Sequence, residues 1–228
     1  MLNYLFIGNS FTFYQDIYEI FAEIAHRAAK TEVHSVFVGR GGHTLLQFAD
    51  PEDQYGAKMR EILKGDVKFD RIIIQEQSCR PMIDYEKFRD GLKGVLACIR
   101  ETQPEARVSL YSTGGYRDEH PKMAEFGMNS DEMEAALFDA YSRAGAEFGL
   151  PVTRVGKAFL RLYRETQINP YGDDKKHPSF IGSYLSALTH FYTEFPEVAE
   201  EAEYCHHLPS TVSGQRVREI AYEVAHFK

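Results

Sequence analysis

Short unbroken runs of apolar residues alternate along this chain with longer segments in which apolar residues recur every three or four positions. The short runs are typical of buried strands, and the recurring pattern is typical of helices with one apolar face. The pattern predicts strands at residues 4–7, 33–38, 70–75, 108–111 and 150–155. It predicts helices over residues 17–28, 88–99, 130–141, 180–191 and 212–227, and a short one around 59–63.

This alternation predicts the fold class. Strands that are apolar along their whole length are buried on both faces, as in a parallel sheet covered by helices on each side. We therefore expect a three-layer α/β/α sandwich with a parallel sheet of about five strands. The 228 residues contain no internal repeat, low-complexity tract or linker, so a single domain over residues 1–228 is expected.

Polar or glycine-rich segments follow four of the predicted strands. In open parallel sheets, ligands bind beyond the carboxyl ends of the strands. We therefore expect these segments to line one edge of the sheet and to hold the functional site. They are residues 8–10, 39–43, 75–78 and 114–120.

Ser10 lies where the first strand turns into the first helix. A serine at that turn presents its hydroxyl at the edge of the sheet, and backbone N–H groups of the helix start face the same space. Ser10 is therefore the candidate nucleophile. The alternative is that Ser10 only caps the helix.

A serine nucleophile needs a base that takes its proton. Two of the nine histidines, His120 and His177, closely follow an aspartate. His177 is the better candidate, because Pro178 favours an extended backbone before the next helix. An offset of three residues also lets Asp174 reach the imidazole and hold its tautomer. Asp173 could take the place of Asp174.

Two segments offer donors for a developing oxyanion. Gly41 and Gly42 follow the second strand, where two glycines let the backbone approach a ligand and offer it an N–H group. Gln75 and Gln77 end the third strand with both amides on one face, and a side-chain amide can donate to an oxyanion. The alternatives are a tight turn for the glycines and an ordinary polar strand end for the glutamines.

The order of these segments resembles that of the SGNH (GDSL-like) hydrolase superfamily. Residues 5–12, Leu-Phe-Ile-Gly-Asn-Ser-Phe-Thr, are similar to its first block, with Asn9 where aspartate is commoner. Asp174, His177 and Pro178 match its last block. The four matching blocks therefore span most of the chain.

The second and third blocks match less closely. Gly42, or Gly41, matches the glycine of the second block. The third block usually supplies an asparagine after a glycine, and Gln-Glu-Gln-Ser stands at residues 75–78 instead. The sequence is similar here to a subset of the superfamily with a Gly-Asn-Ser first block and this third block.

The resemblance implies a flavodoxin-like serine hydrolase that cleaves esters by double displacement and needs no metal or organic cofactor. Ser10, Asp174 and His177 would be its catalytic residues. The backbone N–H groups of Ser10 and Gly42, with the amide of Gln77 or alternatively Gln75, would hold the oxyanion.

Aromatic side chains and polar donors gather in the expected edge segments. Aromatic faces with polar tips suit sugar rings, so we expect Phe11 and Tyr116 to bind substrate together with His43 and Arg80. No long apolar loop that would shelter a fatty chain is evident. The expected substrate is a small-molecule ester with a short acyl group, acetyl on a carbohydrate-like alcohol. The alternatives are a lipase or thioesterase for longer acyl chains, an inactive sugar-binding module and a flavin-binding protein.

Charge and cysteine content narrow the remaining classes. A net charge of −8 argues against nucleic-acid and anionic-membrane partners, which need clustered Lys and Arg. The start of the chain lacks a signal-peptide pattern, so a cytoplasmic location is expected.

The scattered Cys79, Cys98 and Cys205 are expected to be reduced thiols. Residues 205–207, Cys-His-His, favour a surface turn over a metal site, and the sequence leaves the oligomeric state open.

Overall fold

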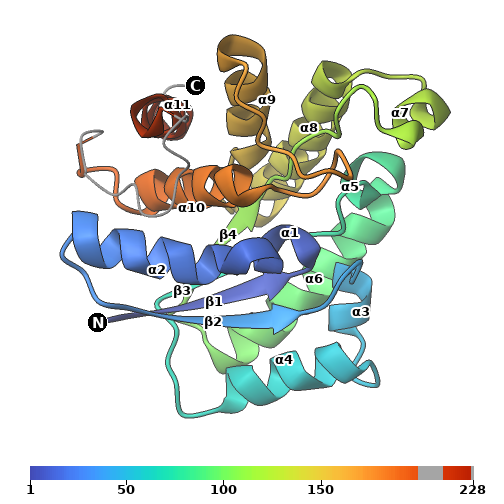
Figure 1. Ribbon diagram of the computed structural model, residues 1–228. Coiled ribbons are helices and arrows are strands. Elements are labelled where there is room, and N and C mark those ends of the chain that lie inside the picture. Colours follow the sequence, from blue (N-terminus) through green and yellow to red (C-terminus); the bar gives the residue numbers. More distant parts are fainter. Residues whose placement is uncertain (200–212, 227–228) are drawn as a thin grey trace.

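The computed structural model describes residues 1–199 and 213–226, and it contains one parallel five-stranded sheet (Figure 1). The strand order is β2-β1-β3-β4-β5, and every neighbouring pair is parallel. This sheet, with helices on both faces, confirms the predicted α/β/α fold class. The strands are β1 (Leu2–Gly8), β2 (Val33–Gly39), β3 (Arg71–Ile74), β4 (Arg107–Tyr111) and β5 (Val152–Thr153).

The helices form one layer on each face of the sheet (Figure 1). One layer contains α2 (Ile17–Ala28), α9 (Val155–Thr166), α10 (Phe180–Glu194) and α11 (Gly214–His226). The other contains α3 (Leu45–Ala49), α4 (Gln54–Lys64), α6 (Tyr85–Thr102) and α8 (Ser130–Phe148).

The central strand β1 shows why this sequence forms a covered sheet. Successive side chains of a strand point to opposite faces. Tyr4 and Phe6 pack with the first helix layer, whereas Leu5 and Ile7 pack with the second. All four side chains are at most 1% exposed, so β1 is apolar throughout because both of its faces are core.

The last predicted strand is wrong in its length. The structure confines β5 to Val152–Thr153, and Val155 already begins helix α9, which the sequence pattern did not predict. Val155, Ala158, Phe159 and Leu162 are buried in α9 at helical spacing. Because the apolar residues of β5 lead almost directly into those of α9, the sequence pattern predicts a single strand over residues 150–155 and no helix after it.

Three further helices are too short to show a helical period in the sequence. They are α1 (Ser10–Phe13), α5 (Arg80–Ile83) and α7 (Pro121–Phe126), and all three lie in the segments that follow strands. The predicted boundaries at residues 212 and 227 lie outside the described residues, as do residues 205–207. Within the described part of the chain, Cys79 and Cys98 are free thiols. No helix described there combines the length and apolarity needed to cross a bilayer.

Candidate active site

Ser10 is the first residue of α1, directly after β1. Asn9 caps the helix, and its side-chain oxygen accepts a hydrogen bond from the backbone N–H of Phe11 at 3.3 Å. The turn has no room for a side chain at Gly8, where a Cβ would lie 2.4 Å from Thr12 Oγ1. This tight turn places the Ser10 hydroxyl at the carboxyl edge of the sheet, and the residue is 8% exposed.

The structure brings Ser10, His177 and Asp174 together in one hydrogen-bonded chain. Ser10 Oγ lies 2.8 Å from His177 Nε2, and His177 Nδ1 lies 2.5 Å from Asp174 Oδ2. With its proton on Nδ1, the imidazole donates to the carboxylate and leaves Nε2 free to accept the serine proton. The arrangement can therefore activate a serine hydroxyl as a nucleophile.

The loop that carries His177 also fixes its aspartate. Asp174 Oδ1 accepts from the backbone N–H of His177 at 3.0 Å, and Gly172 N–H donates to the His177 carbonyl at 2.8 Å. Burial alone would raise the pKa of Asp174, but hydrogen bonds from the His177 ring and from the loop backbone bring it below its usual value. The carboxylate is thus held ionised beside the imidazole. Asp173, the alternative, is exposed.

His120 lies elsewhere on the same edge. Its Nδ1 accepts from the backbone N–H of Lys122 at 3.2 Å and caps α7, and its ring lies 4.6 Å from that of Tyr116. The hydrogen bond to Ser10 is made by His177. Of the two histidines that follow an aspartate, His177 is therefore the one that the fold pairs with the serine.

Two backbone N–H groups, those of Ser10 and Gly42, are candidates for holding an oxyanion. Neither Ser10 N–H nor Gly42 N–H donates to another described residue. Gly42 has φ +71°, a left-handed conformation that glycine adopts without strain. The side-chain amide of Asn9 donates to the His43 carbonyl at 3.0 Å and so ties the Gly42 turn to the serine turn.

The two glutamines after β3 have different surroundings. Gln75 is 1% exposed, its oxygen accepts from Asn9 N–H at 2.9 Å and Thr12 Oγ1 at 3.0 Å, and its NH₂ group donates to the Glu76 carbonyl. The Gln75 amide is thus used inside the scaffold, which speaks against it as an oxyanion donor. The Gln77 oxygen accepts from the backbone of Cys79 at 3.2 Å. Its NH₂ group donates to Ser78 and has a second hydrogen to offer, so Gln77 stays the prediction for the third donor.

Glu76, between these glutamines, is a buried carboxylate that the sequence reasoning did not single out. It is 1% exposed, and it accepts from the backbone N–H groups of Leu45 at 3.2 Å and Gln77 at 2.5 Å. Burial raises its pKa to about 7, against the opposing effect of these hydrogen bonds and of nearby Arg80. Glu76 thereby joins the segment after β2 to the segment after β3. Its neighbours in the sequence gave no sign of burial, because the strand pattern ends before it.

The four residues predicted to bind substrate differ in how far they are buried. His43 is 1% exposed, with its Nε2 3.0 Å from Asp53 Oδ1, so its side chain is part of the core under the site rather than its surface. Burial lowers the pKa of His43. Tyr116 is 2% exposed, and its hydroxyl lies 2.7 Å from Ser78 Oγ, so the prediction that it presents a polar tip is wrong. His43 is buried against the rings of Phe48 and Tyr55, and Tyr116 is buried in an apolar cluster with Met123 and Met133.

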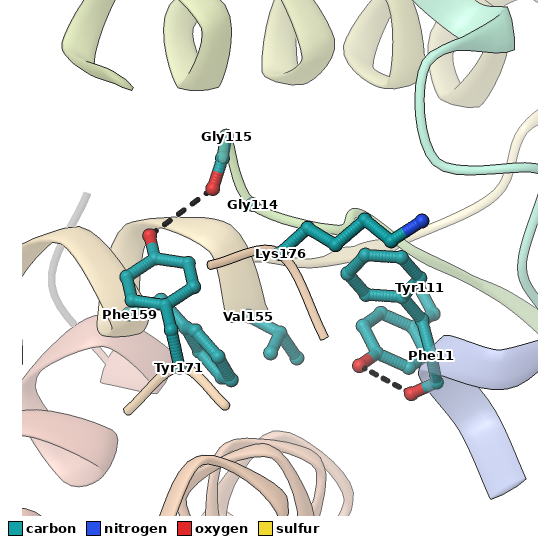
Figure 2. Close-up of a pocket in the computed structure, with 8 residues that line it drawn as sticks. All are labelled: Phe11, Tyr111, Gly114, Gly115, Val155, Phe159, Tyr171 and Lys176. Atoms are coloured by element: carbon teal, nitrogen blue, oxygen red, sulfur yellow. Dashed lines mark hydrogen bonds between the residues drawn. The ribbon is translucent and has the colours of Figure 1, made fainter. Parts of the chain in front are cut away.

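Phe11 and Arg80 are better placed. Arg80 is partly exposed and lies 3.5 Å from Asp84. The Phe11 ring lies 5.2 Å from the His177 ring and lines a narrow pocket at the end of β4 (Figure 2). The pocket has an empty volume of about 210 Å³, and its free centre admits a group about the size of one water molecule. Its lining residues are Phe11, Tyr111, Gly114, Gly115, Val155, Phe159, Tyr171 and Lys176.

Two tyrosine hydroxyls close this pocket from opposite sides (Figure 2). Tyr111 donates to the Phe11 carbonyl at 3.0 Å, and Tyr171 donates to the Gly115 carbonyl at 3.1 Å. Both hydroxyls are engaged with backbone, so the surface left to an occupant is mainly ring and aliphatic carbon. Lys176, the residue before His177, also lines the pocket.

Comparison with known proteins gives matches among solved structures. No protein-family model matches the sequence, and no curated protein does. A candidate SGNH hydrolase from Slackia heliotrinireducens is 25% identical, with a TM-score of 0.69 over 82% of this chain and 95% of that one. A DUF4886 family protein from Bacteroides uniformis is 19% identical, with a TM-score of 0.78 over 97% of this chain and 93% of the other.

An acetyl-xylooligosaccharide esterase from Geobacillus, solved as a single-residue variant, is also similar. It is 15% identical, with a TM-score of 0.57 over 83% of this chain and 93% of that protein. Chains described as lipases match as well, among them a lipase/acylhydrolase from Enterococcus faecalis with a TM-score of 0.60 over 90% of this chain and 100% of that one at 18% identity.

Proposed function

We propose that this chain, by its fold an ester hydrolase of the SGNH (GDSL-like) superfamily, cleaves short-acyl esters with Ser10 as nucleophile. The observation that carries the proposal is the hydrogen-bonded chain from Ser10 Oγ through His177 to Asp174. The hydrogen bond from Ser10 to His177 supplies the base that a serine hydroxyl lacks on its own.

In the first half of the reaction, His177 Nε2 takes the Ser10 proton while Ser10 Oγ attacks the ester carbonyl. The imidazolium that forms is stabilised by Asp174, whose pKa is held low by its hydrogen bonds. The developing oxyanion is received by the N–H groups of Ser10 and Gly42 and by the Gln77 amide. His177 then gives its proton to the leaving alcohol, and the acyl group stays on Ser10.

In the second half, a water molecule takes the place of the alcohol. His177 removes a proton from that water, which attacks the acyl-enzyme, and the proton returns to Ser10 Oγ as the acid leaves. Each step uses only groups of this chain and water.

The narrow pocket beside Phe11 supports a short acyl group. Ser10 and His177 do not line this pocket themselves, but it is lined by Phe11, which follows the proposed nucleophile, and by Lys176, which precedes the proposed base. Its free centre suits one methyl group, and a longer chain would have to displace the Phe159 and Val155 side chains. We therefore favour acetyl esters, on a carbohydrate-like alcohol as in the similar acetyl-xylooligosaccharide esterase.

The decisive experiment is hydrolysis of p-nitrophenyl acetate and acetylated sugars by the natural chain and by Ser10→Ala. Ser10→Ala is expected to lose ~10⁴-fold or more in rate and to keep its fold by circular dichroism. Ser35→Ala, in strand β2, is the matched control and should retain full activity. Equal rates for Ser10→Ala and the natural chain would refute the proposed nucleophile.

The lipases among the similar structures make longer acyl chains the second candidate. The profile of kcat/KM with acyl length separates the two. Preference for octanoyl over acetyl esters by ~10-fold or more, equivalent to ~1.4 kcal/mol, would overturn the short-acyl assignment. No turnover of any ester, with sugar binding retained, would instead favour an inactive binding module.

A further inference from the structure

The His177 imidazole is covered on one face by the ring of Tyr14. The two ring centroids are 4.4 Å apart and the planes are inclined by only 6°. Both ring nitrogens of His177 are engaged in the plane of the ring, with Ser10 and Asp174. A restraint that acts on the imidazole without disturbing these two hydrogen bonds must therefore act on a face, and Tyr14 is placed to do so.

The backbone next to Tyr14 adopts an unfavourable conformation. Gln15 and Asp16 both have φ 53°, in the left-handed region that residues with a Cβ rarely occupy. This kink separates α1 from α2. Consecutive residues of this kind persist where the surroundings hold them, and they cluster at functional sites.

A hydrogen bond from the far side of the site holds the kink. Ser183 Oγ donates to the Tyr14 carbonyl at 3.1 Å. Ser183 belongs to α10, the helix that follows the His177 loop. The backbone that carries the Tyr14 ring is thus held from the nucleophile side by the kink and from the base side by α10.

The loop around His177 needs such a restraint. Asp173 and Asp174 are exposed, and the side chain of Asp174 is 43% exposed. A catalytic imidazole must keep one orientation through two proton transfers, and misplacement by about 1 Å can cost ~100-fold in rate. An aromatic face in contact also favours the positively charged imidazolium that forms when the serine proton is taken.

We propose that Tyr14 is a positioning residue, whose ring clamps the His177 imidazole in the plane that it shares with Ser10 and Asp174. The inference rests on the proposed function, because it concerns how the same base is held. The Tyr14 ring restrains the imidazole, and the Tyr14 hydroxyl is not needed for this restraint.

The test compares Tyr14→Leu with Tyr14→Phe and Tyr14→Trp, which keep an aromatic face. Tyr14→Leu is expected to lower kcat for p-nitrophenyl acetate ~10-fold with KM changed less than ~2-fold. Tyr14→Phe and Tyr14→Trp should stay within ~3-fold of the natural chain. Tyr222→Leu is the matched control, because Tyr222 stacks on His226, a histidine outside the site, with the ring centroids 4.0 Å apart.

Two results would overturn the clamp. In one, Tyr14→Leu keeps full kcat. In the other, Tyr14→Phe loses as much as Tyr14→Leu, which would make the hydroxyl the important group. If Tyr14→Leu does not fold, the Phe and Trp variants still test the hydroxyl against the ring.

A second measurement separates this inference from the proposed function. The Nδ1 proton of His177, shared with Asp174, can be observed by proton NMR in a protein without substrate. Loss of that signal in Tyr14→Leu, and its retention in Tyr14→Phe, would support the clamp even if no ester were turned over. An unchanged signal in Tyr14→Leu would count against it whatever the activity of Ser10→Ala.

Discussion

The turn that carries Ser10 and the loop that carries His177 meet at one point but are built differently. The serine turn is embedded in the core, where Asn9, Thr12 and Gln75 are each 1% exposed and hydrogen-bonded to one another. The histidine loop is more exposed, and it is held by its own backbone, by the Asp174 carboxylate and by a hydrogen bond from the Arg117 N–H to the Lys175 carbonyl at 2.9 Å. One partner of the proposed pair therefore lies in a buried hydrogen-bond network, whereas the other lies in a partly exposed loop.

The largest effect should come from removing the base of the surface loop. His177→Ala is expected to lower kcat/KM by ~10⁴-fold, as much as Ser10→Ala, because a triad loses its function as a unit. The His177 side chain is only 14% exposed, but it belongs to a loop and not to the core of the sheet. The midpoint of unfolding should therefore change little. His120→Ala is the control and should be far milder. The reverse ranking in ester assays would move the base to His120.

A loss no larger than that of His177→Ala should follow when the charge behind the imidazole is neutralised. Asp174→Asn keeps the side-chain shape but offers an amide where the imidazole needs an acceptor, so a fall in kcat of up to ~10⁴-fold is expected. Asp173→Asn, one position earlier and exposed, should stay within ~2-fold. Equal losses in the two variants would show that the aspartates share the role.

A change in the buried turn should act first on stability. Gln75→Leu removes the acceptor of Asn9 N–H and Thr12 Oγ1 and leaves two buried donors unpaired. The free energy of unfolding, measured in urea, should fall by ~2–4 kcal/mol. Gln54→Leu at the exposed start of α4 should change it by less than ~0.5 kcal/mol. A Gln75→Leu protein of unchanged stability would contradict the description of this turn as a hydrogen-bonded scaffold.

The stability of the buried residues near the serine turn should also depend on pH, through Glu76. The pKa of Glu76 is raised from 4.5 to about 7, so the folded state binds a proton that the unfolded state has lost over this range. The stability that this proton contributes is complete below pH ~4.5 and is lost as pH rises through ~7, by roughly 2–4 kcal/mol.

Glu76→Gln should remove this fall in the free energy of unfolding with rising pH. The measurement is the difference in unfolding free energy between the natural chain and Glu76→Gln at each pH. Other groups titrate as well, and Asp53 and Asp174, whose pKa values are lowered, act with the opposite sign. They cancel in the difference. Glu61→Gln on the exposed face of α4 is the control and should leave the slope in place. A natural chain and Glu76→Gln with parallel pH curves would argue against a buried, titrating Glu76.

The sequence predicted the fold where periodicity was long and failed where elements were short. Strands β1 to β4 and helices such as α2 and α6 gave clear apolar patterns. Strand β5 is only two residues long and runs almost directly into α9, so one apolar stretch served two elements. The parallel order then follows from the alternation of strands and helices.

The candidate site was predictable as an order of segments but not as a set of contacts. Ser10, Asp174 and His177 could be singled out as candidates because Ser10 follows a strand, His177 precedes a proline and Asp174 lies three residues before His177. The orientation of the Gln75 amide depends on partners that are distant in the sequence, Asn9 above all. The sequence places His43 and Tyr116 in edge segments, which predicts contact with substrate, but the packing of those segments buries both side chains.

The contact between Ser10 and His177 joins residues 167 positions apart, whereas His177 and Asp174 are three apart. Closing a short loop costs little chain entropy and happens early, but a contact of such long range forms only when both ends of the chain have docked on the sheet. In refolding from denaturant, recovery of secondary structure should therefore run ahead of recovery of ester cleavage. The rate at which activity returns would then report the last step of folding, in which the histidine loop docks against the serine turn.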